Sequence, residues 1–163
     1  MAGVTEKSIR QSNMLRGKAW NIYFDAIDPT GADDHFLYIK NSAKRPLEVT
    51  KMELFSTVAG FVEPFRASGD PANTPATNVP ANLRGDGSKP VATVNTGVDL
   101  ALTVGEKLGG HYLAANTPRV IDLEHCIVIQ PGTAVAFNWD QATGVLTGMV
   151  TLHEVPAEDD PSG

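Results

Sequence analysis

Short runs of residues in which apolar and polar side chains alternate fill most of this chain, and Gly, Pro, Asn and Asp separate one run from the next. A period of two is typical of β-strands that bury one face. The well-defined runs are residues 18–27, 35–41, 47–58, 91–94, 100–104, 120–123, 126–129, 134–139 and 145–155, with weaker ones at 61–65 and 111–114. About eight to nine short strands with almost no helical pattern predict an all-β protein made of two sheets or a closed barrel.

A jelly roll, which has eight strands, fits this count best. We therefore predict a jelly-roll-like two-sheet β-sandwich with an extended N-terminal arm. An immunoglobulin-like sandwich is the alternative, but the chain has a single cysteine, Cys126, and so lacks the cysteine pair typical of that fold. The apolar neighbours Ile127 and Val128 predict that Cys126 is buried and is not a nucleophile.

Two runs make sharper predictions about packing. The face of the first run that we expect in the core consists of Trp20, Ile22, Phe24 and Ala26. In residues 47–58 the apolar phase changes between Val49 and Met52. Such a change indicates either a β-bulge or a bend at which the strand passes from one sheet to the other.

The length of 163 residues fits one domain, which needs neither a disulfide nor a metal to fold. We divide the chain into an N-terminal arm of residues 1–17, a sandwich domain of residues 18–155 and an acidic, flexible tail of residues 156–163. Within the domain, residues 67–90 are rich in Pro and Gly and predict a long loop, because these residues interrupt helices and central strands. The loop contains Arg84-Gly85-Asp86, which we interpret as an ordinary turn.

The charge is unevenly distributed. The chain has a formal net charge of −6, which argues against nucleic acid as a general partner because phosphates repel it. The tail and the residues just before it are acidic. The arm and its junction with the domain are basic, and their candidate partner-binding residues are Lys7, Arg10, Arg16 and Lys18. We interpret them as an arm that binds an acidic neighbour, the alternative being two solvated termini.

The sequence contains no apolar run long enough to cross a membrane and no signal-peptide pattern, so we expect synthesis in the cytoplasm and no membrane partner. Motifs for hydrolases and nucleotide-binding loops are also missing, and we predict no enzyme activity and no cofactor. The segment Gly105–Gly110 is glycine-rich like a phosphate loop but is better explained as a hairpin turn.

The four histidines are scattered, without the spacing that places two imidazoles on one face. If any of them bound a metal, His125 and His153 would be the best-placed pair. Asp28, Asp33 and Asp34 are a conceivable calcium site, but they lack the regular spacing of calcium loops. Capping of a turn explains Asp33 and Asp34 better.

Two segments resemble those of head decoration (cement) proteins of tailed bacteriophages: DPTGADDHFLYIKN, residues 28–41, and CIVIQPGTAVAFNWDQATGVLTGMVTLHEV, residues 126–155. The resemblance implies jelly-roll strands and a structural virion protein on the outer surface of the capsid. Its partners would be the major capsid protein and further copies of itself in a homo-dimer or homo-trimer. The long loop and the acidic tail depart from this pattern.

Two other functions fit the same sequence. The chain would work as a receptor- or glycan-binding module of a tail fibre or spike if Trp20, Tyr23 or Tyr112 formed an exposed aromatic platform, although aromatic side chains more often pack in a core. A cupin-like metalloenzyme is the third possibility, and it would require histidines that converge in space.

Overall fold

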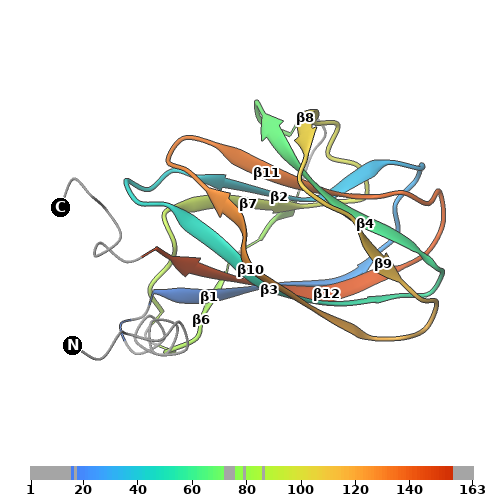
Figure 1. The fold of residues 1–163 in the computed structure, drawn as a ribbon, viewed down its shortest axis with the longest axis horizontal. Coiled ribbons are helices and arrows are strands. Elements are labelled where there is room, and N and C mark those ends of the chain that lie inside the picture. The colour runs from blue at the N-terminus through green and yellow to red at the C-terminus, as the bar shows by residue number, and fades with distance from the viewer. Residues whose placement is uncertain (1–15, 17, 72–75, 79, 86, 156–163) are drawn as a thin grey trace.

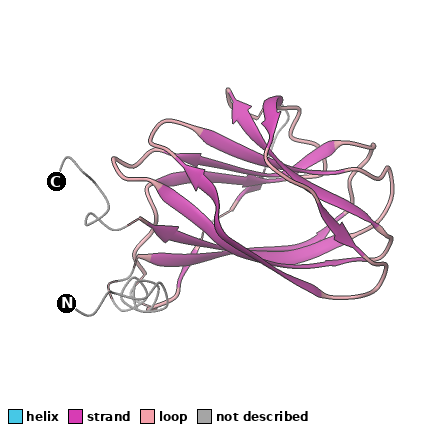
Figure 2. Cartoon of the chain, viewed as in Figure 1, coloured by secondary structure: helices cyan, strands magenta, loops and turns pink. Residues whose placement is uncertain are grey.

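The computed structural model describes residues 16, 18–71, 76–78, 80–85 and 87–155, and these residues contain strands and loops but no helix (Figure 2). The strands are β1 (Ala19–Ile27), β2 (Asp34–Asn41), β3 (Leu47–Ser56), β4 (Gly60–Ser68), β5 (Ala76–Thr77), β6 (Ala81–Asn82), β7 (Ala92–Thr96), β8 (Thr103–Lys107), β9 (His111–Leu113), β10 (Arg119–Ile129), β11 (Ala134–Trp139) and β12 (Leu146–Glu154). They form two antiparallel sheets that pack face to face (Figure 1).

The strand order confirms the predicted jelly-roll-like sandwich. The β1 sheet has the order β10-β3-β12-β1-β6, and the β2 sheet has the order β5-β7-β2-β11-β4-β8, with β9 also paired to β4. The first strand therefore pairs with the last, the second with the next to last, the third with β10 and the fourth with β8 and β9. This nesting of strand pairs, divided between two sheets, is the jelly-roll arrangement.

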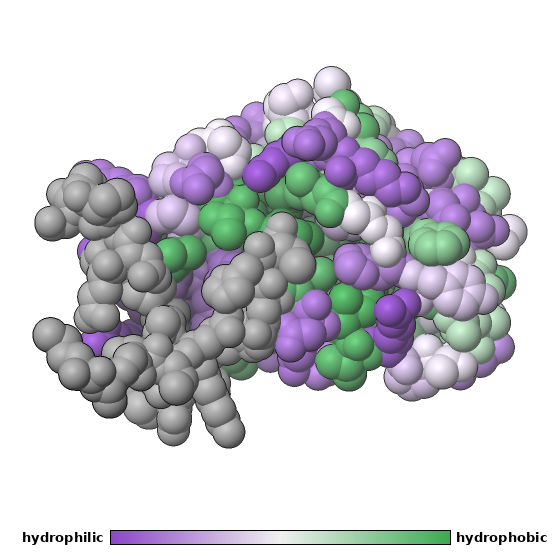
Figure 3. All heavy atoms as spheres, in the orientation of Figure 1, coloured by the Kyte–Doolittle hydropathy of each residue, from purple (hydrophilic) through white to green (hydrophobic). Residues whose placement is uncertain are grey.

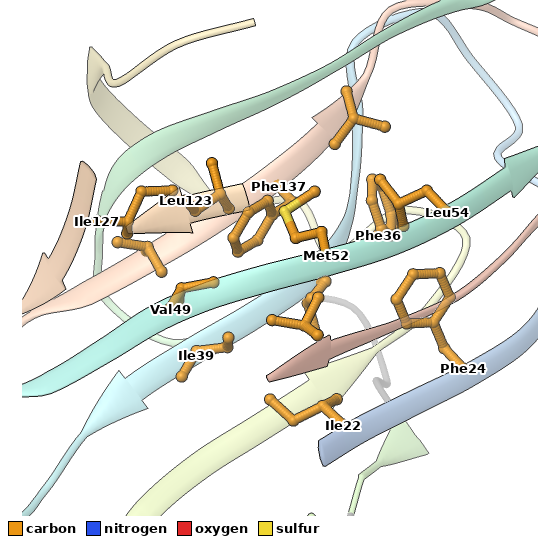
Figure 4. Close-up of a cluster of buried hydrophobic side chains, with 14 of the residues drawn as sticks. Ile22, Phe24, Phe36, Ile39, Val49, Met52, Leu54, Leu123, Ile127 and Phe137 are labelled. Atoms are coloured by element: carbon orange, nitrogen blue, oxygen red, sulfur yellow. The ribbon is translucent and has the colours of Figure 1, made fainter. Parts of the chain in front are cut away.

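The core lies between the two sheets, and Figure 4 shows its side chains pointing toward one another from both layers. Trp20, Ile22 and Phe24 are buried in it as predicted, but Ala26 is exposed. The pairing of β1 with β12 shifts register after Phe24, and Ala26 has a positive φ of 50°. This irregularity turns Ile27 inward in place of Ala26, so the predicted core position of Ala26 is wrong.

The phase change in residues 47–58 is a β-bulge. In the ladder with β12, Thr151 pairs with Lys51 and Leu152 pairs with Val49, so Thr50 is the extra residue. Because β3 stays beside β12 along its whole length, the bulge is confirmed and the passage between sheets does not occur.

Opposite this bulge, β10 is one strand where the sequence predicted two. Its pairing with β3 shifts register between Asp122 and Ile127, which explains why the apolar pattern breaks there. The side chains of residues 124–126 lie outside the described part of the structure, and so does the predicted burial of Cys126.

The segment before β9 is not a hairpin turn. Both β8 and β9 pair antiparallel with β4, so they run in the same direction and form one strand interrupted at residues 108–110. The predicted strand at 100–104 begins only at Thr103, because Leu100 packs on the outer face of the β2 sheet instead.

The predicted long loop 67–90 adds to both sheets. Its described residues form β6, beside β1, and β5, beside β7, each of which is two residues long at an edge. In the Arg84–Gly85 turn, the Asn82 side-chain oxygen accepts the Arg84 amide at 2.8 Å, which supports an ordinary turn. Residue 86 is not described.

Candidate interaction surfaces

The outer face of the β1 sheet carries a row of side chains that includes large apolar groups. Val120 pairs with Glu53, Glu53 with Met149, and Met149 with Tyr23, so the four residues lie side by side across β10, β3, β12 and β1. Paired residues of antiparallel strands project from the same face of a sheet. Val120 is 66% exposed and Tyr23 is 60% exposed, which leaves both ends of the row open to solvent.

A shallow groove of about 450 Å³ follows this row, and we call it the β1-sheet groove. Its apolar lining includes Tyr23, Phe55, Pro118, Val120 and Met149, while Glu53 and Arg119 supply charge. The groove combines an apolar floor with a few polar groups, as protein-binding surfaces do.

The exposed apolar residues are not confined to that groove. The large hydrophobic side chains that the described surface exposes are Tyr23, Phe61, Val91, Val98, Tyr112 and Val120. On the side of the molecule drawn in Figure 3, hydrophobic residues gather toward the centre among hydrophilic ones. Scattered residues of this kind are normal for a protein surface, whereas the β1-sheet groove joins two of them, Tyr23 and Val120, through the partly buried Met149.

A second groove, of about 620 Å³, lies at the end of the sandwich where β1 begins and β12 ends, on the left in Figure 1. We call it the terminal groove, and its lining consists of Lys18, Ser42, Ala43, Lys44, Arg45, Val91 and Glu154. The Glu154 carboxylate lies 3.4 Å from the Lys18 ammonium and 4.0 Å from the Arg45 guanidinium.

The loop that carries Lys44 and Arg45 is held by a buried side chain. The Asn41 amide nitrogen donates to the Arg45 and Ile129 carbonyls, both at 2.8 Å, and its oxygen accepts the Ala43 amide at 2.8 Å. Asn41 is fully buried, so these bonds anchor the loop to a side chain that is shielded from water.

Of the four basic residues predicted to bind a partner, the structure places two. Lys7 and Arg10 lie outside the described residues, Arg16 is exposed in a turn, and Lys18 forms the ion pair with Glu154. The sequence analysis missed Lys44 and Arg45. Their signal is the adjacent pair of bases in the loop between two predicted strands, and nothing in the sequence places that loop beside Lys18.

The candidate aromatic platform divides into buried and exposed members. Trp20 is buried, and its indole donates to the Ser88 carbonyl at 3.0 Å, so it cannot form part of a platform. Tyr23 and Tyr112 are exposed, and Tyr112 contacts Phe61 edge-on with ring centroids 5.4 Å apart. Phe61 is 42% and Tyr112 48% exposed, so this pair offers two aromatic surfaces to solvent.

Among the described residues, no group of three or more His, Cys, Asp or Glu side chains is arranged to hold a metal ion. His153 is buried in β12, and the side chain of His125 is not described, so the structure does not test that pair. Burial lowers the pKa of His35 below its usual value although Asp99, Asp34 and Asp33 oppose the shift. Burial, together with Arg119, also lowers the pKa of His111.

The acidic turn after β1 is explained by its own hydrogen bonds. The Asp34 carboxylate accepts the Gly31 amide at 2.5 Å and the Thr30 hydroxyl at 3.0 Å. Asp33, whose φ is 65°, accepts a bond of 3.3 Å from the Asn138 side chain. These contacts are those expected of turn-capping residues.

No helix in the described part of the chain has the length and apolar character needed to span a membrane. Comparison with protein-family models, with curated proteins and with solved structures gave no match.

Proposed function

We propose that this chain is a structural virion protein that binds the outer surface of a tailed-bacteriophage capsid and cements neighbouring major capsid subunits. The observation that carries the proposal is the β1-sheet groove, in which apolar side chains from four neighbouring strands lie together, exposed at Val120 and Tyr23 and partly buried at Phe55 and Met149. The resemblance of residues 28–41 and 126–155 to decoration proteins supports the major capsid protein as the partner.

A cementing protein has to resist deformation while it adheres. The residues of the core come from both sheets and are close to fully buried, which gives a stiff scaffold. Side chains on the central strands of such a scaffold need little ordering when they bind, so less of the binding free energy is lost. A specific interface buries roughly 1,200–2,000 Å² in total, so the groove would form only its centre.

A capsid presents the same binding surface many times, which would strengthen the overall binding even where a single contact is weak. Copies that associate as a homo-dimer or homo-trimer engage several capsid subunits at once, and linkage raises the effective concentration of each further contact. Lys7, Arg10 and Arg16 would then add basic contacts with acidic capsid surfaces. This arrangement requires no catalytic group and no cofactor.

Cosedimentation with purified capsids of the phage that encodes this chain tests the proposal. Val120→Lys places a charge in the β1-sheet groove and should reduce binding at least tenfold, since an unpaired charge at the centre of an interface is costly. Val98→Lys is the matched control, because Val98 is also an exposed valine, at 45%, but lies outside the groove. Equal capsid binding by both variants and the natural chain would overturn the role of the groove, and no binding by any of them would overturn the capsid partner.

A second function, glycan binding, is favoured by the Phe61–Tyr112 pair. Aromatic rings that present their faces to solvent can stack on the apolar faces of sugars, and these two rings are each about half exposed. A glycan array should then show binding that Tyr112→Ala abolishes and Tyr23→Ala leaves intact. An array without any bound glycan removes this function.

A further inference from the structure

The terminal groove carries more positive charge than its own carboxylate can balance. Lys18, Lys44 and Arg45 line it together with Glu154, which is shared between Lys18 and Arg45. Lys44 forms no ion pair with any residue that the structure describes. A basic groove is unusual in a chain with a net charge of −6, and it attracts anionic groups at short range.

The groove is also preorganised. Asn41 fixes the backbone of the loop that bears Lys44 and Arg45, and the Ser42 amide donates to the Val91 carbonyl at 3.0 Å. Val91 is 61% exposed and adds an apolar wall beside the cations. A fixed site with charges and one apolar wall suits an extended acidic peptide that contains small or proline residues.

The chain itself supplies such a peptide at the edge of the groove. Glu154 lines the groove, and the amide of the next residue, Val155, donates to the Pro46 carbonyl at 3.0 Å, directly beside Arg45. The residues that follow, 156–163, read PAEDDPSG and include three carboxylates in succession, Glu158 to Asp160. Since an extended chain spans at most about 3.3–3.6 Å per residue, the first of these carboxylates begins within about 11 Å of Val155.

We propose that the terminal groove is a binding site for an acidic peptide and that residues 156–163 of the same chain occupy it. The tether gives the tail an effective concentration of roughly millimolar, so weak ion pairs suffice to hold it. The bound tail neutralises Lys18, Lys44 and Arg45, and an acidic segment of any partner has to displace it before it can reach these residues. This inference does not depend on capsid binding and holds or fails without it.

Zero-length cross-linking of carboxylates to amines, applied to the full chain, tests this occupancy. Mass spectrometry should find links from Glu158, Asp159 or Asp160 to Lys44 or Lys18. The Lys51–Glu53 pair, with 2.7 Å between nitrogen and oxygen, is the internal positive control. In about 1 M salt, where the Debye length is about 3 Å, the tail links should fall several-fold.

Two comparisons identify the segment that occupies the terminal groove. In an equal mixture of chains with natural and heavy isotopes, links within one isotope class only support the chain's own tail, whereas mixed links overturn it in favour of a second copy. Tail links that go instead to Lys7 in the arm, or equally to the remote Lys107, overturn the groove as the site.

Backbone amide chemical shifts measured by NMR test the same occupancy independently, without a cross-linking reaction. The triple variant Glu158→Gln, Asp159→Asn and Asp160→Asn should shift the amides of Ser42, Ala43, Lys44 and Arg45 relative to the natural chain. The amides of β8, which carries Lys107, should stay unchanged. The inference fails if the loop amides are identical in both chains at low salt.

Discussion

The two sheets of the sandwich differ in what covers their outer faces. On the β2 sheet, Leu100 packs against Tyr38 and Ala134, with Leu102 at the margin, and the Leu100 amide donates to the His35 carbonyl at 3.0 Å. On the β1 sheet nothing comparable covers the row from Val120 to Tyr23 within the described residues. In the described part of the chain, the connection between β7 and β8 thus covers the outer face of the β2 sheet, and no such connection covers that of the β1 sheet.

This difference predicts that the two sheets have different roles. The covered sheet is buried on both sides at β11, all six residues of which are buried, and it contributes mainly to stability. The open sheet contributes one face to the core and has one face for contacts. Mutations of the covered face should therefore change folding, and mutations of the open face should change binding.

The largest effect on stability should follow truncation of Leu100, which covers the outer face of the β2 sheet. Leu100→Ala should lower the free energy of unfolding by about 2–5 kcal/mol, because Leu100 is fully buried and its loss leaves a cavity. Urea denaturation followed by fluorescence measures it. Val98→Ala, at an exposed position in the same connection, should change the stability by less than about 0.5 kcal/mol, and equal effects of the two variants would show that the cover adds nothing.

The same variant should be visible in the titration of Tyr38. Burial raises the pKa of Tyr38 to about 12, with Asp70 contributing, and its hydroxyl donates to the Gly69 carbonyl at 2.7 Å. In Leu100→Ala the ring gains access to water, so its pKa should move back toward 10. Ultraviolet absorbance against pH measures this, and an unchanged titration would mean that the connection does not shield the ring.

A second, smaller loss of stability should follow a substitution of Gly148 in β12, a strand of the β1 sheet. A side chain at Gly148 would lie 2.5 Å from the Glu53 carbonyl oxygen and 2.7 Å from Leu54, between two paired strands. Gly148→Ala should cost about 1–3 kcal/mol through overpacking, as measured by thermal or urea unfolding. Gly105→Ala is the control, because its nearest neighbour would be 3.9 Å away. If both variants unfold like the natural chain, β3 and β12 accommodate the added methyl group more easily than the short distances at Gly148 imply.

Acid should also lower the stability through His35 and His111, which both lie in the covered sheet. Burial lowers the pKa of both imidazoles in the folded state. As the pH falls below about 6.5, the unfolded chain binds more protons at these sites than the folded chain, so the free energy of unfolding decreases until the pH passes the folded-state pKa. Double substitution of both residues by Gln should flatten the dependence between pH 7 and 5 in urea unfolding. A slope unchanged by the substitution would assign the acid sensitivity to other groups.

In the β1 sheet the alternation of residues 18–27 and 47–58 indicated strands, and the phase change between Val49 and Met52 left two alternatives, of which the bulge, at Thr50, is the one that occurs. The division of β10 into two strands and the core position of Ala26 were wrong. In the covered sheet the runs 35–41, 91–94 and 134–139 were also predicted as strands, and β2, β7 and β11 confirm them. Leu100 was assigned to a strand because it begins the apolar run 100–104, although it packs on the outer face of the β2 sheet.

The candidate sites depended on information that local sequence does not contain. The β1-sheet groove joins Val120 to Tyr23 through pairings between strands far apart in the chain, and the terminal groove joins Lys18 to Lys44 in the same way. Period and composition specify which residues face outward, but register decides which of them become neighbours. Of the residues that line the two grooves, only Lys18 and Tyr23 were therefore named as candidate binding residues from the sequence, and neither was assigned to a groove.

The smallest effect on stability should come from the open face itself, and it gives the sharpest contrast with the cover. Val120→Thr keeps the β-branched shape and replaces a methyl group by a hydroxyl at a position that is 66% exposed. Its free energy of unfolding should stay within about 0.5 kcal/mol of the natural chain in urea denaturation. Capsid binding by the same variant should weaken, since the apolar contact area in the β1-sheet groove is reduced. A loss of stability as large as that of Leu100→Ala would mean that Val120 belongs to the folding core, and the separation of the two faces into one for stability and one for contact would then fail.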